Sequence, residues 1–239
     1  MPSLTVGLPP QLNVKEAPMN TQINLNQPLI QPSSSTGCKA SNLKSQFACP
    51  TGLLGGLAGR LMAIKNAKMN EFAVKMLDVQ PDDQALEIGF GHGRTIRMIA
   101  ERAKAGFVAG IDLSDVMVRQ AAKYNLDLII AGRVEVCQGS VADLPYEYGR
   151  FTKALAVNNY QFWPNAELNL VEMRRVMREG GLLVLCLRMH STSRFALAPG
   201  FTEDEVAEVA GLVRWVGFHD IRIVKRKVGR EISCVIARR

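Results

Sequence analysis

The sequence contains no apolar run of the roughly 20 residues that a membrane-spanning helix needs, so no membrane span is expected. Its five cysteines form no C-x-x-C pair and no spacing typical of metal ligands, so no metal site is predicted. Three of them, Cys137, Cys186 and Cys234, lie in apolar runs, where free cysteine behaves as a small buried hydrophobe. This usage favours a reducing, cytoplasmic setting over a disulfide-stabilised secreted protein.

Acidic residues are nearly absent from the first part of the chain. Residues 1–46 contain a single acid, Glu16, together with six of the eleven prolines. These prolines interrupt the apolar core that a signal peptide needs, and the first arginine is Arg60, which weakens a transit-peptide interpretation. Such a segment buries too little apolar surface to offset the entropy of ordering. We therefore expect a flexible tail at 1–46 and one folded domain at 47–239.

The formal net charge of +7 is concentrated near the C-terminus, where residues 214–239 carry eight Lys/Arg against Asp220 and Glu231. Such a patch would suit nucleic acid or another anionic ligand. The basic residues also interleave with apolar ones in Ile221–Lys227, which is typical of an edge strand protected against aggregation. The edge-strand interpretation is favoured.

From residue 53 onward, apolar strand-like runs alternate with amphipathic stretches of helical spacing. The predicted strands are Gln84–Ile88, Phe107–Asp112, Val134–Cys137, Phe151–Val157, Leu182–Leu187, Phe218–Lys225 and Ile232–Ala237. The predicted helices are Leu53–Asp78, Arg94–Lys104, Ser114–Tyr124, Asn165–Met177 and Thr202–Val216. Gly180 and Gly181 are expected to end the fourth helix, and Thr202 with Glu205 to form a capping box on the fifth.

This alternation predicts an α/β fold with a doubly wound, mostly parallel seven-stranded sheet. The last two strands are joined by a turn too short for a crossover, so the C-terminal strand is expected to run antiparallel. Ligands in such sheets bind outside the carboxyl ends of the strands. Gly89–Gly93, Asp112, Ser140 and Asn158 all follow strand ends. They should therefore lie on one rim of the sheet.

The glycine-rich turn Gly89–Gly93 follows the first predicted strand and precedes a helix, and Asp112 ends the next strand. Glycines there permit positive φ angles and let a ligand approach the backbone closely. An acid at the position of Asp112 can bind the two hydroxyls of a ribose. Nicotinamide dinucleotides and S-adenosylmethionine (SAM) are both ligands of this pattern.

Two details favour SAM. The dinucleotide fingerprint is G-x-G-x-x-G, whereas here the third glycine comes one residue early and Arg94 takes the expected place. Glu87, beside the loop, would repel a pyrophosphate but attract the ammonium group of an amino acid. On the residues alone, a nicotinamide-dependent oxidoreductase stays open as the alternative.

Four segments resemble, in order, the motifs of class I SAM-dependent methyltransferases. Ala85–Gly93 (ALEIGFGHG) is similar to their first motif and Val108–Ser114 (VAGIDLS) to their second. Gln138–Tyr146 (QGSVADLPY) resembles the element after the third strand, and Leu170–Gly181 (LVEMRRVMREGG) the run before the fifth. The branch it most resembles is the type 11 group, which includes quinone-biosynthesis methyltransferases. The resemblance implies a Rossmann-like methyltransferase fold with SAM as the cofactor.

The resemblance also implies which residues hold the cofactor: the methionine part lies at the glycine loop, the ribose at Asp112, and the adenine between Ser140 and Val141. The implied cofactor residues are Glu87, Gly89, Phe90, Gly91, Gly93, Asp112, Leu113, Ser140, Val141 and Asn158.

Three positions depart from the family pattern. Ser140 replaces an acid, Thr152 replaces the aspartate that starts the fourth strand, and Glu179 replaces a proline. Because of these departures, a non-catalytic binding protein with a methyltransferase fold is a further alternative.

Methyl transfer from a sulfonium is an in-line attack, so the enzyme chiefly positions the nucleophile. Residues after the fourth and fifth strands are the candidates for this work. Asn158, which would equally suit a turn, and His190 are candidate catalytic residues, and Tyr160 and Trp163 candidate substrate contacts. The Asn158–Gln161 run lacks the prolines of the loop that methylates nucleobase amines. A small-molecule acceptor is therefore expected rather than nucleic acid, while the attacked atom and the oligomeric state stay open.

Overall fold

The computed structural model describes residues 66–190 and 200–239 of the chain. The expected flexible tail, the domain boundary at residue 47, the first part of the helix predicted from Leu53, and Cys38 and Cys49 all lie outside these residues. The described helices include none with the length and hydropathy of a membrane span.

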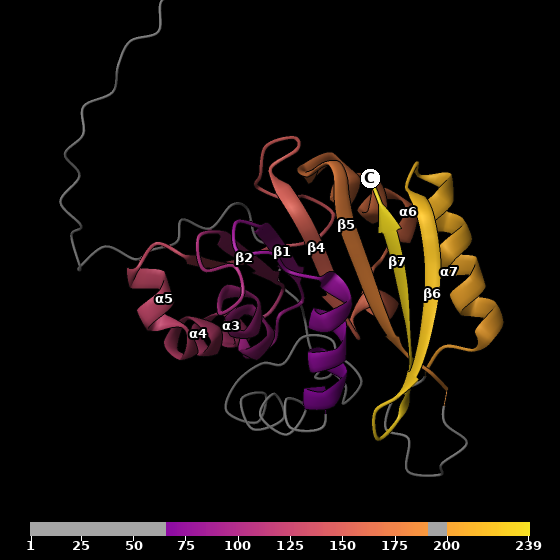
Figure 1. Cartoon of the computed structure of the whole chain (residues 1–239), viewed down its shortest axis with the longest axis horizontal. Coiled ribbons are helices and arrows are strands. Elements are labelled where there is room, and N and C mark those ends of the chain that lie inside the picture. Colours follow the sequence, from indigo (N-terminus) through magenta and orange to yellow (C-terminus); the bar gives the residue numbers. More distant parts are fainter. Residues whose placement is uncertain (1–65, 191–199) are drawn as a thin grey trace, which may run out of the picture. The chain divides into compact units, whose positions relative to one another are not determined.

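A seven-stranded mixed sheet, in the order β3-β2-β1-β4-β5-β7-β6, is the central layer (Figure 1). Its strands are β1 (Gln84–Ile88), β2 (Phe107–Asp112), β3 (Val134–Gln138), β4 (Phe151–Val157), β5 (Met177–Arg188), β6 (His219–Lys227) and β7 (Glu231–Arg238). The pairs from β3 to β5 in this order are parallel, and β7 pairs antiparallel with both β5 and β6. The predicted doubly wound, mostly parallel sheet with a C-terminal antiparallel strand is confirmed.

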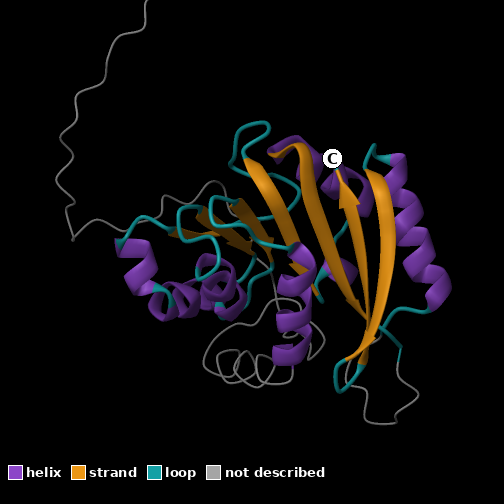
Figure 2. Cartoon of the chain, in the orientation of Figure 1, coloured by secondary structure: helices purple, strands orange, loops and turns teal. Residues whose placement is uncertain are grey.

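Helices cover both faces of the sheet (Figures 1 and 2). One face packs against the helix at residues 66–77 and against α3 (Arg94–Ala100), α4 (Asp115–Tyr124) and α5 (Leu126–Ile130). The other face packs against α6 (Ala166–Val176) and α7 (Glu203–Trp215). A 3-10 turn, η1 (Tyr160–Phe162), follows β4.

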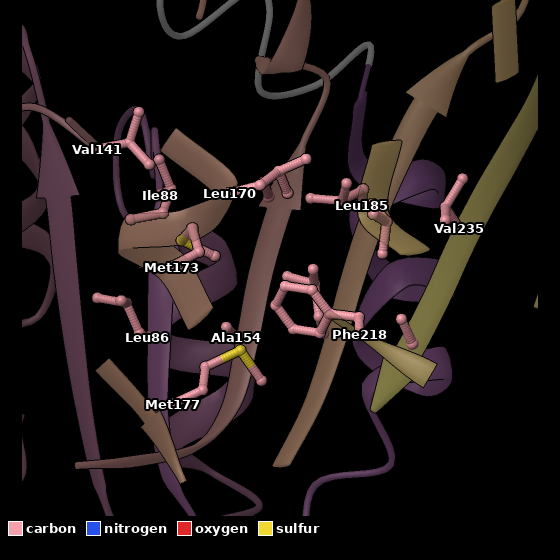
Figure 3. Close-up of a cluster of buried hydrophobic side chains, with 14 of the residues drawn as sticks. Leu86, Ile88, Val141, Ala154, Leu170, Met173, Met177, Leu185, Phe218 and Val235 are labelled. Carbon is pink, nitrogen blue, oxygen red and sulfur yellow. The ribbon is translucent and has the colours of Figure 1, made fainter. Parts of the chain in front are cut away.

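The alternation of side chains along β5 explains why the sheet has two cores. Leu183 and Leu185 belong to the cluster on the α6 and α7 face, which Figure 3 shows, while Val184 and Cys186 belong to the opposite one. A strand buried on both faces has no polar side, which is why this run is continuously apolar. Each large aliphatic side chain buried in this way contributes about 1.5–3 kcal/mol.

Three helices begin at the caps that the sequence predicts. The Ser114 hydroxyl accepts a hydrogen bond from the Met117 N–H at the start of α4, and the Asn165 side chain caps α6. At α7, the Thr202 hydroxyl accepts from the Glu205 N–H and the Glu205 carboxylate from the Thr202 N–H, which completes the predicted capping box. Each such cap satisfies backbone donors that the first helical turn leaves unpaired.

The predicted role of Gly180 and Gly181 as a helix C-cap is wrong. Helix α6 ends at residue 176, because the buried Met177 already pairs with Phe151 as the first residue of β5. The two glycines lie inside β5 at a register shift, where Gly180 has a φ of +73° and Gly181 accepts a hydrogen bond from the Arg239 N–H at 2.9 Å. The glycines therefore form a bulge in the strand.

Two shorter elements, α5 and η1, have no counterpart among the predicted ones, and α3 ends four residues before Lys104. The elements α5 and η1 are too short to give a periodic hydrophobic signal. Helix α3 is predicted by its spacing, and only its end is misplaced.

The basic C-terminal segment lies at the edge of the sheet. Strand β6 is the last strand in the order and most of its residues are exposed. Strands β4, β5 and β7 separate it from β1 and the glycine loop. Its position suits charged protection of an edge strand.

Thr152, one of the departures from the family pattern, belongs to a hydrogen-bonded network at the opposite end of the strands from the glycine loop. Its hydroxyl donates to Asp83 Oδ1 at 2.6 Å and accepts from the Gln84 N–H at 3.0 Å. Asp83 is buried and also faces Lys153, with 3.7 Å between Nζ and Oδ2. The departure thus connects the starts of β1 and β4 and leaves the carboxyl-end rim untouched.

Replacing Thr152 with valine should destabilise the fold without weakening ligand binding at the rim. Valine has the same shape but leaves the buried Asp83 carboxylate without one donor, which costs about 1–3 kcal/mol. Urea unfolding of wild type and Thr152→Val measures the free energy of unfolding. Calorimetry with S-adenosylhomocysteine, which is SAM without its methyl group, measures the binding of the predicted ligand. An unchanged stability, or a binding loss as large as the stability loss, would contradict this assignment.

Candidate active site

A pocket lies at the carboxyl ends of β1, β2 and β4. Strands β2 and β4 flank β1 on its two sides, so the chain reverses its direction across the sheet at this point. Such a reversal leaves the loops on either side of it pointing apart, which opens a crevice. The pocket is lined by the glycine loop, the end of β2, the turn after β3 and the segment after β4.

The glycine loop has the backbone that its sequence predicts. Gly89, Gly91 and Gly93 have φ angles of +66°, +58° and +87°, which favour glycine. A Cβ at Gly91 would meet no atom of residues 66–190 and 200–239 within 4 Å, so within these residues it borders open space. A Cβ at Gly89 would instead overlap the Asn159 side chain, and one at Gly93 would lie 2.7 Å from the Cβ of Ala121. Only Gly91 therefore offers its bare backbone to a ligand.

Asp112 connects this loop to the start of α4. Its Oδ2 accepts a hydrogen bond from the Gly91 N–H and its Oδ1 from the Ser114 N–H, each at 2.9 Å. Burial raises the pKa of Asp112 to about 6, and the two hydrogen bonds to the charged form oppose that rise. Each carboxylate oxygen has a second acceptor site, so Asp112 can still accept two hydroxyl donors from a ligand.

Glu87 is the most unusual group in the pocket. It is 2% exposed, and its Oε2 has no hydrogen-bond partner within the described part of the chain. Burial, and then the negative charge of Asp112, raise the pKa of Glu87 to about 8, although a hydrogen bond with the Thr95 side chain opposes the rise. A buried acceptor of this kind calls for a donor or a cation. The chemistry of the pocket is thus suited to a positively charged group.

The segment after β4 forms the other side of the pocket. Asn158 has a φ of +53°, as expected for its alternative role in a turn. The Asn159 side chain donates from Nδ2 to the Ile88 carbonyl, which joins this segment to the end of β1. Phe162 and Trp163 follow and bring aromatic side chains to the lining.

The structure brings most of the sequence-predicted site residues together. Those that line the pocket are Glu87, Gly89, Phe90, Gly91, Asp112, Leu113, Ser140, Val141, Asn158 and Trp163. The lining does not include Gly93, which is the N-cap of α3 and packs on α4. It does not include Tyr160, whose ring packs against Trp163 and Phe201. The distances between ring centroids are 5.1 Å to Trp163 and 6.1 Å to Phe201. His190 is exposed and also lies outside the lining.

Several lining residues have no counterpart among the predicted ones. Asn70 comes from the helix at residues 66–77 and Thr95 from the first turn of α3. Asn66, from the same helix, also lines the pocket, and the sequence suggests that helix as a candidate cover for the cofactor or as simple packing. His92 had a signal, because it lies between two glycines of the loop; its ring stacks on Tyr124 with 6.0 Å between centroids. Burial, and then the charge of Arg94, lower the pKa of His92.

Comparisons with known proteins point to one family. Residues 85–181 match the family model described as a methyltransferase domain. YdaC of Bacillus subtilis, described as an uncharacterized methyltransferase, is 26% identical over 77% of this chain and 98% of its own length. YrhH of the same organism, which has the name "Putative methyltransferase YrhH", is 32% identical over 69% of this chain and 82% of its own length. A solved SAM-dependent methyltransferase from Aquifex aeolicus has the same fold, with a TM-score of 0.64 at 18% identity over 76% of this chain and 97% of that one.

Replacing Glu87 with glutamine should change how the stability of the ligand-free protein depends on pH. The folded-state pKa of about 8 exceeds the ordinary value of 4.5, so between these values the folded protein holds a proton that the unfolded chain has lost. The extra proton held by the folded protein adds to its free energy of unfolding. This addition is complete at low pH and is lost as the pH rises through the folded-state pKa. We expect wild type to lose up to about 1.4 kcal/mol per pH unit relative to Glu87→Gln in this window.

Urea unfolding of both proteins across the window measures the difference. A difference that stays constant with pH would contradict a buried carboxyl group without a charged partner.

Proposed function

We propose that the pocket beside Gly89–Gly91 binds the cofactor of this chain, which belongs to the class I SAM-dependent methyltransferases of the type 11 group. As a member of that family, the chain is an enzyme that transfers a methyl group from SAM to a small-molecule acceptor. The segment after β4 forms the acceptor side of the pocket. The observation that carries this proposal is the buried Oε2 of Glu87 beside the glycine loop, which has no hydrogen-bond partner among the residues that the structure describes.

The methionine part of SAM fits the loop and Glu87. Its ammonium group supplies the donors and the positive charge that the Glu87 carboxylate needs in a buried site. The open space over the Gly91 backbone leaves room for a chain to pass without meeting a Cβ. A pyrophosphate would place negative charge beside Glu87 and Asp112 together, which argues against a nicotinamide dinucleotide.

The nucleoside part fits the neighbouring residues. Asp112 keeps two free acceptor sites for the ribose hydroxyls while the backbone holds its carboxylate in place. Ser140 and Val141 line the pocket, and we assign the adenine to the space beside them. The Ser140 hydroxyl accepts a hydrogen bond from the Ala142 N–H at 3.2 Å, so it stabilises the turn in which it lies. The base would then be held by packing and by backbone groups, and the acid missing at Ser140 is not needed.

When bound, SAM supplies a methyl group that is activated by attachment to a sulfonium. The acceptor side of the pocket offers the Asn158 amide and the aromatic faces of Phe162 and Trp163. These groups can orient a nucleophile and exclude water, which are the main requirements of an in-line transfer. A general base is required only for a nucleophile that is protonated at the working pH. Asn158 is therefore proposed as a positioning residue, and His190, exposed and outside the lining, is not assigned a step.

A small-molecule acceptor is proposed over nucleic acid on two grounds. The basic strand β6 lies at the sheet edge, and three strands separate it from β1. The turn after β4 carries Asn158 and Asn159 without proline. A cytoplasmic setting is also proposed, because Cys137, Cys186 and Cys234 are free thiols.

Replacing Asp112 with asparagine should weaken S-adenosylhomocysteine binding by about 10–100-fold, because the amide loses charge-assisted hydrogen bonds to both the ribose and the backbone. Isothermal titration calorimetry measures the affinity. The matched control is Asp115→Asn: Asp115 lies in the same turn but is exposed and pairs with Arg119 at 2.7 Å, so its removal should leave binding unchanged.

Absence of binding by a folded wild-type protein would reject the proposed site. Tighter binding of NADPH than of S-adenosylhomocysteine would reject it in favour of a nicotinamide-dependent oxidoreductase.

A further inference from the structure

We propose that the pocket binds the purine ring of its cofactor without recognising the 6-amino group of adenine, and that Ser140 sets this tolerance. The inference rests on the proposed function of the pocket. It concerns the turn at residues 139–141, which directly follows β3 and contributes all three of its residues to the lining.

The acids that line the pocket lie on β1 and β2, not on the turn after β3. Among the described residues these acids are Glu87 and Asp112. The rest of the chain, residues 1–65 and 191–199, contains a single acid, Glu16. The proposed cofactor uses both lining acids, because its ammonium group lies at Glu87 and its ribose at Asp112. Within the described residues, no lining carboxylate is then left for the base.

The polar atoms of Ser140 are engaged within their own turn. Its hydroxyl accepts a hydrogen bond from the Ala142 N–H at 3.2 Å, and its carbonyl accepts one from the Asp143 N–H at 3.2 Å. A serine hydroxyl in such a turn keeps one proton to donate and one further acceptor site. It can therefore bond either to an amine or to an acceptor atom of a base, and its chemistry favours neither.

A site rejects an analogue strongly when the missing ligand group leaves a buried polar atom of the protein unpaired. Ser140 does not meet this condition, because its hydroxyl is paired with the Ala142 N–H in the ligand-free protein. Leu113 and Val141, which also line the pocket, are apolar. Packing of a ring against such residues depends on its flat faces and not on its 6-substituent. Loss of the amine should therefore cost little affinity.

The competing explanation is that the carboxylate of Asp143 recognises the amine in place of Ser140. Asp143 is exposed and does not belong to the lining. The pKa of Arg175 on α6 is raised by its hydrogen bond with Glu172 and, to a smaller extent, by the charge of Asp143. The Asp143 carboxylate therefore lies close enough to α6 to act on Arg175. These observations favour Ser140 as the residue beside the base.

The experiment compares S-adenosylhomocysteine with its analogue in which hydrogen replaces the 6-amino group, each titrated by calorimetry into wild type and Ser140→Asp. Wild type should bind the two ligands with affinities within about threefold of each other. Aspartate at this position keeps the turn, because its carboxylate can accept the Ala142 N–H as the serine hydroxyl does, and it adds an oxygen that attracts the amine. The variant should therefore raise the preference for S-adenosylhomocysteine by about 10-fold, as for one charge-assisted hydrogen bond.

The matched control is Ala142→Asp, which adds the same charge to the same turn at an exposed residue outside the lining. Its ratio of the two affinities should equal that of wild type.

A wild-type preference for S-adenosylhomocysteine larger than about threefold would overturn the inference, and loss of that preference in Asp143→Asn would assign the amine to Asp143. This wild-type comparison is decisive by itself if Ser140→Asp does not fold. A ratio that stays unchanged in Ser140→Asp, or that rises equally in Ala142→Asp, would overturn the role of Ser140. Wild type that binds neither ligand would instead overturn the proposed function of the pocket.

Discussion

Burying the carboxyl group of Glu87 beside the glycine loop costs the ligand-free protein stability, because Oε2 has no donor within the described part of the chain and Asp112 places a second acid nearby. Nothing in the packing of the fold requires an acid at this position of β1. Its neighbours along the strand, Leu86 and Ile88, are core residues. A cost of this kind is typical of a functional site, where a ligand supplies what the protein alone leaves unsatisfied.

The sheet topology turns this single group into a site. Parallel strands bring their carboxyl ends to one rim, and the reversal between β1 and β4 opens the crevice there. The rim therefore collects Glu87 from β1, Asp112 from β2, Ser140 from the turn after β3 and Asn158 from the turn after β4. The two cores on either face pack against these strands, so the site is built on the buried sheet.

Much of this arrangement could be predicted from the sequence, because the signals are local. The strand–glycine–helix pattern and the acid at the end of the next strand predict the sheet, the rim and the cofactor residues. The contributions of Asn159 and Thr95 could not be predicted in this way. Each depends on a contact between different elements of the fold. The hydrogen bond from the Asn159 side chain to the Ile88 carbonyl, for example, joins residues that are far apart in the sequence. The same limit explains Gly180, where pairing of the next strand overrides the helix-ending signal.

Two of the three departures from the family pattern, Thr152 and Ser140, have physical explanations of the same kind. Thr152 belongs to a network with Asp83 at the far ends of the strands, and Ser140 closes its own turn. Neither removes a group that the proposed cofactor site needs. The departures therefore do not favour a protein that has lost its catalytic role.

The most direct test of the account is the number of protons released when S-adenosylhomocysteine binds, measured by calorimetry near pH 7 in buffers of different ionisation enthalpy. Because the pKa of Glu87 is about 8 in the ligand-free protein, its carboxyl group is mostly protonated there. An ammonium bound against it would favour the carboxylate and expel that proton. The account predicts a release of close to one proton per bound ligand. Binding with no proton released, or with protons taken up, would contradict it.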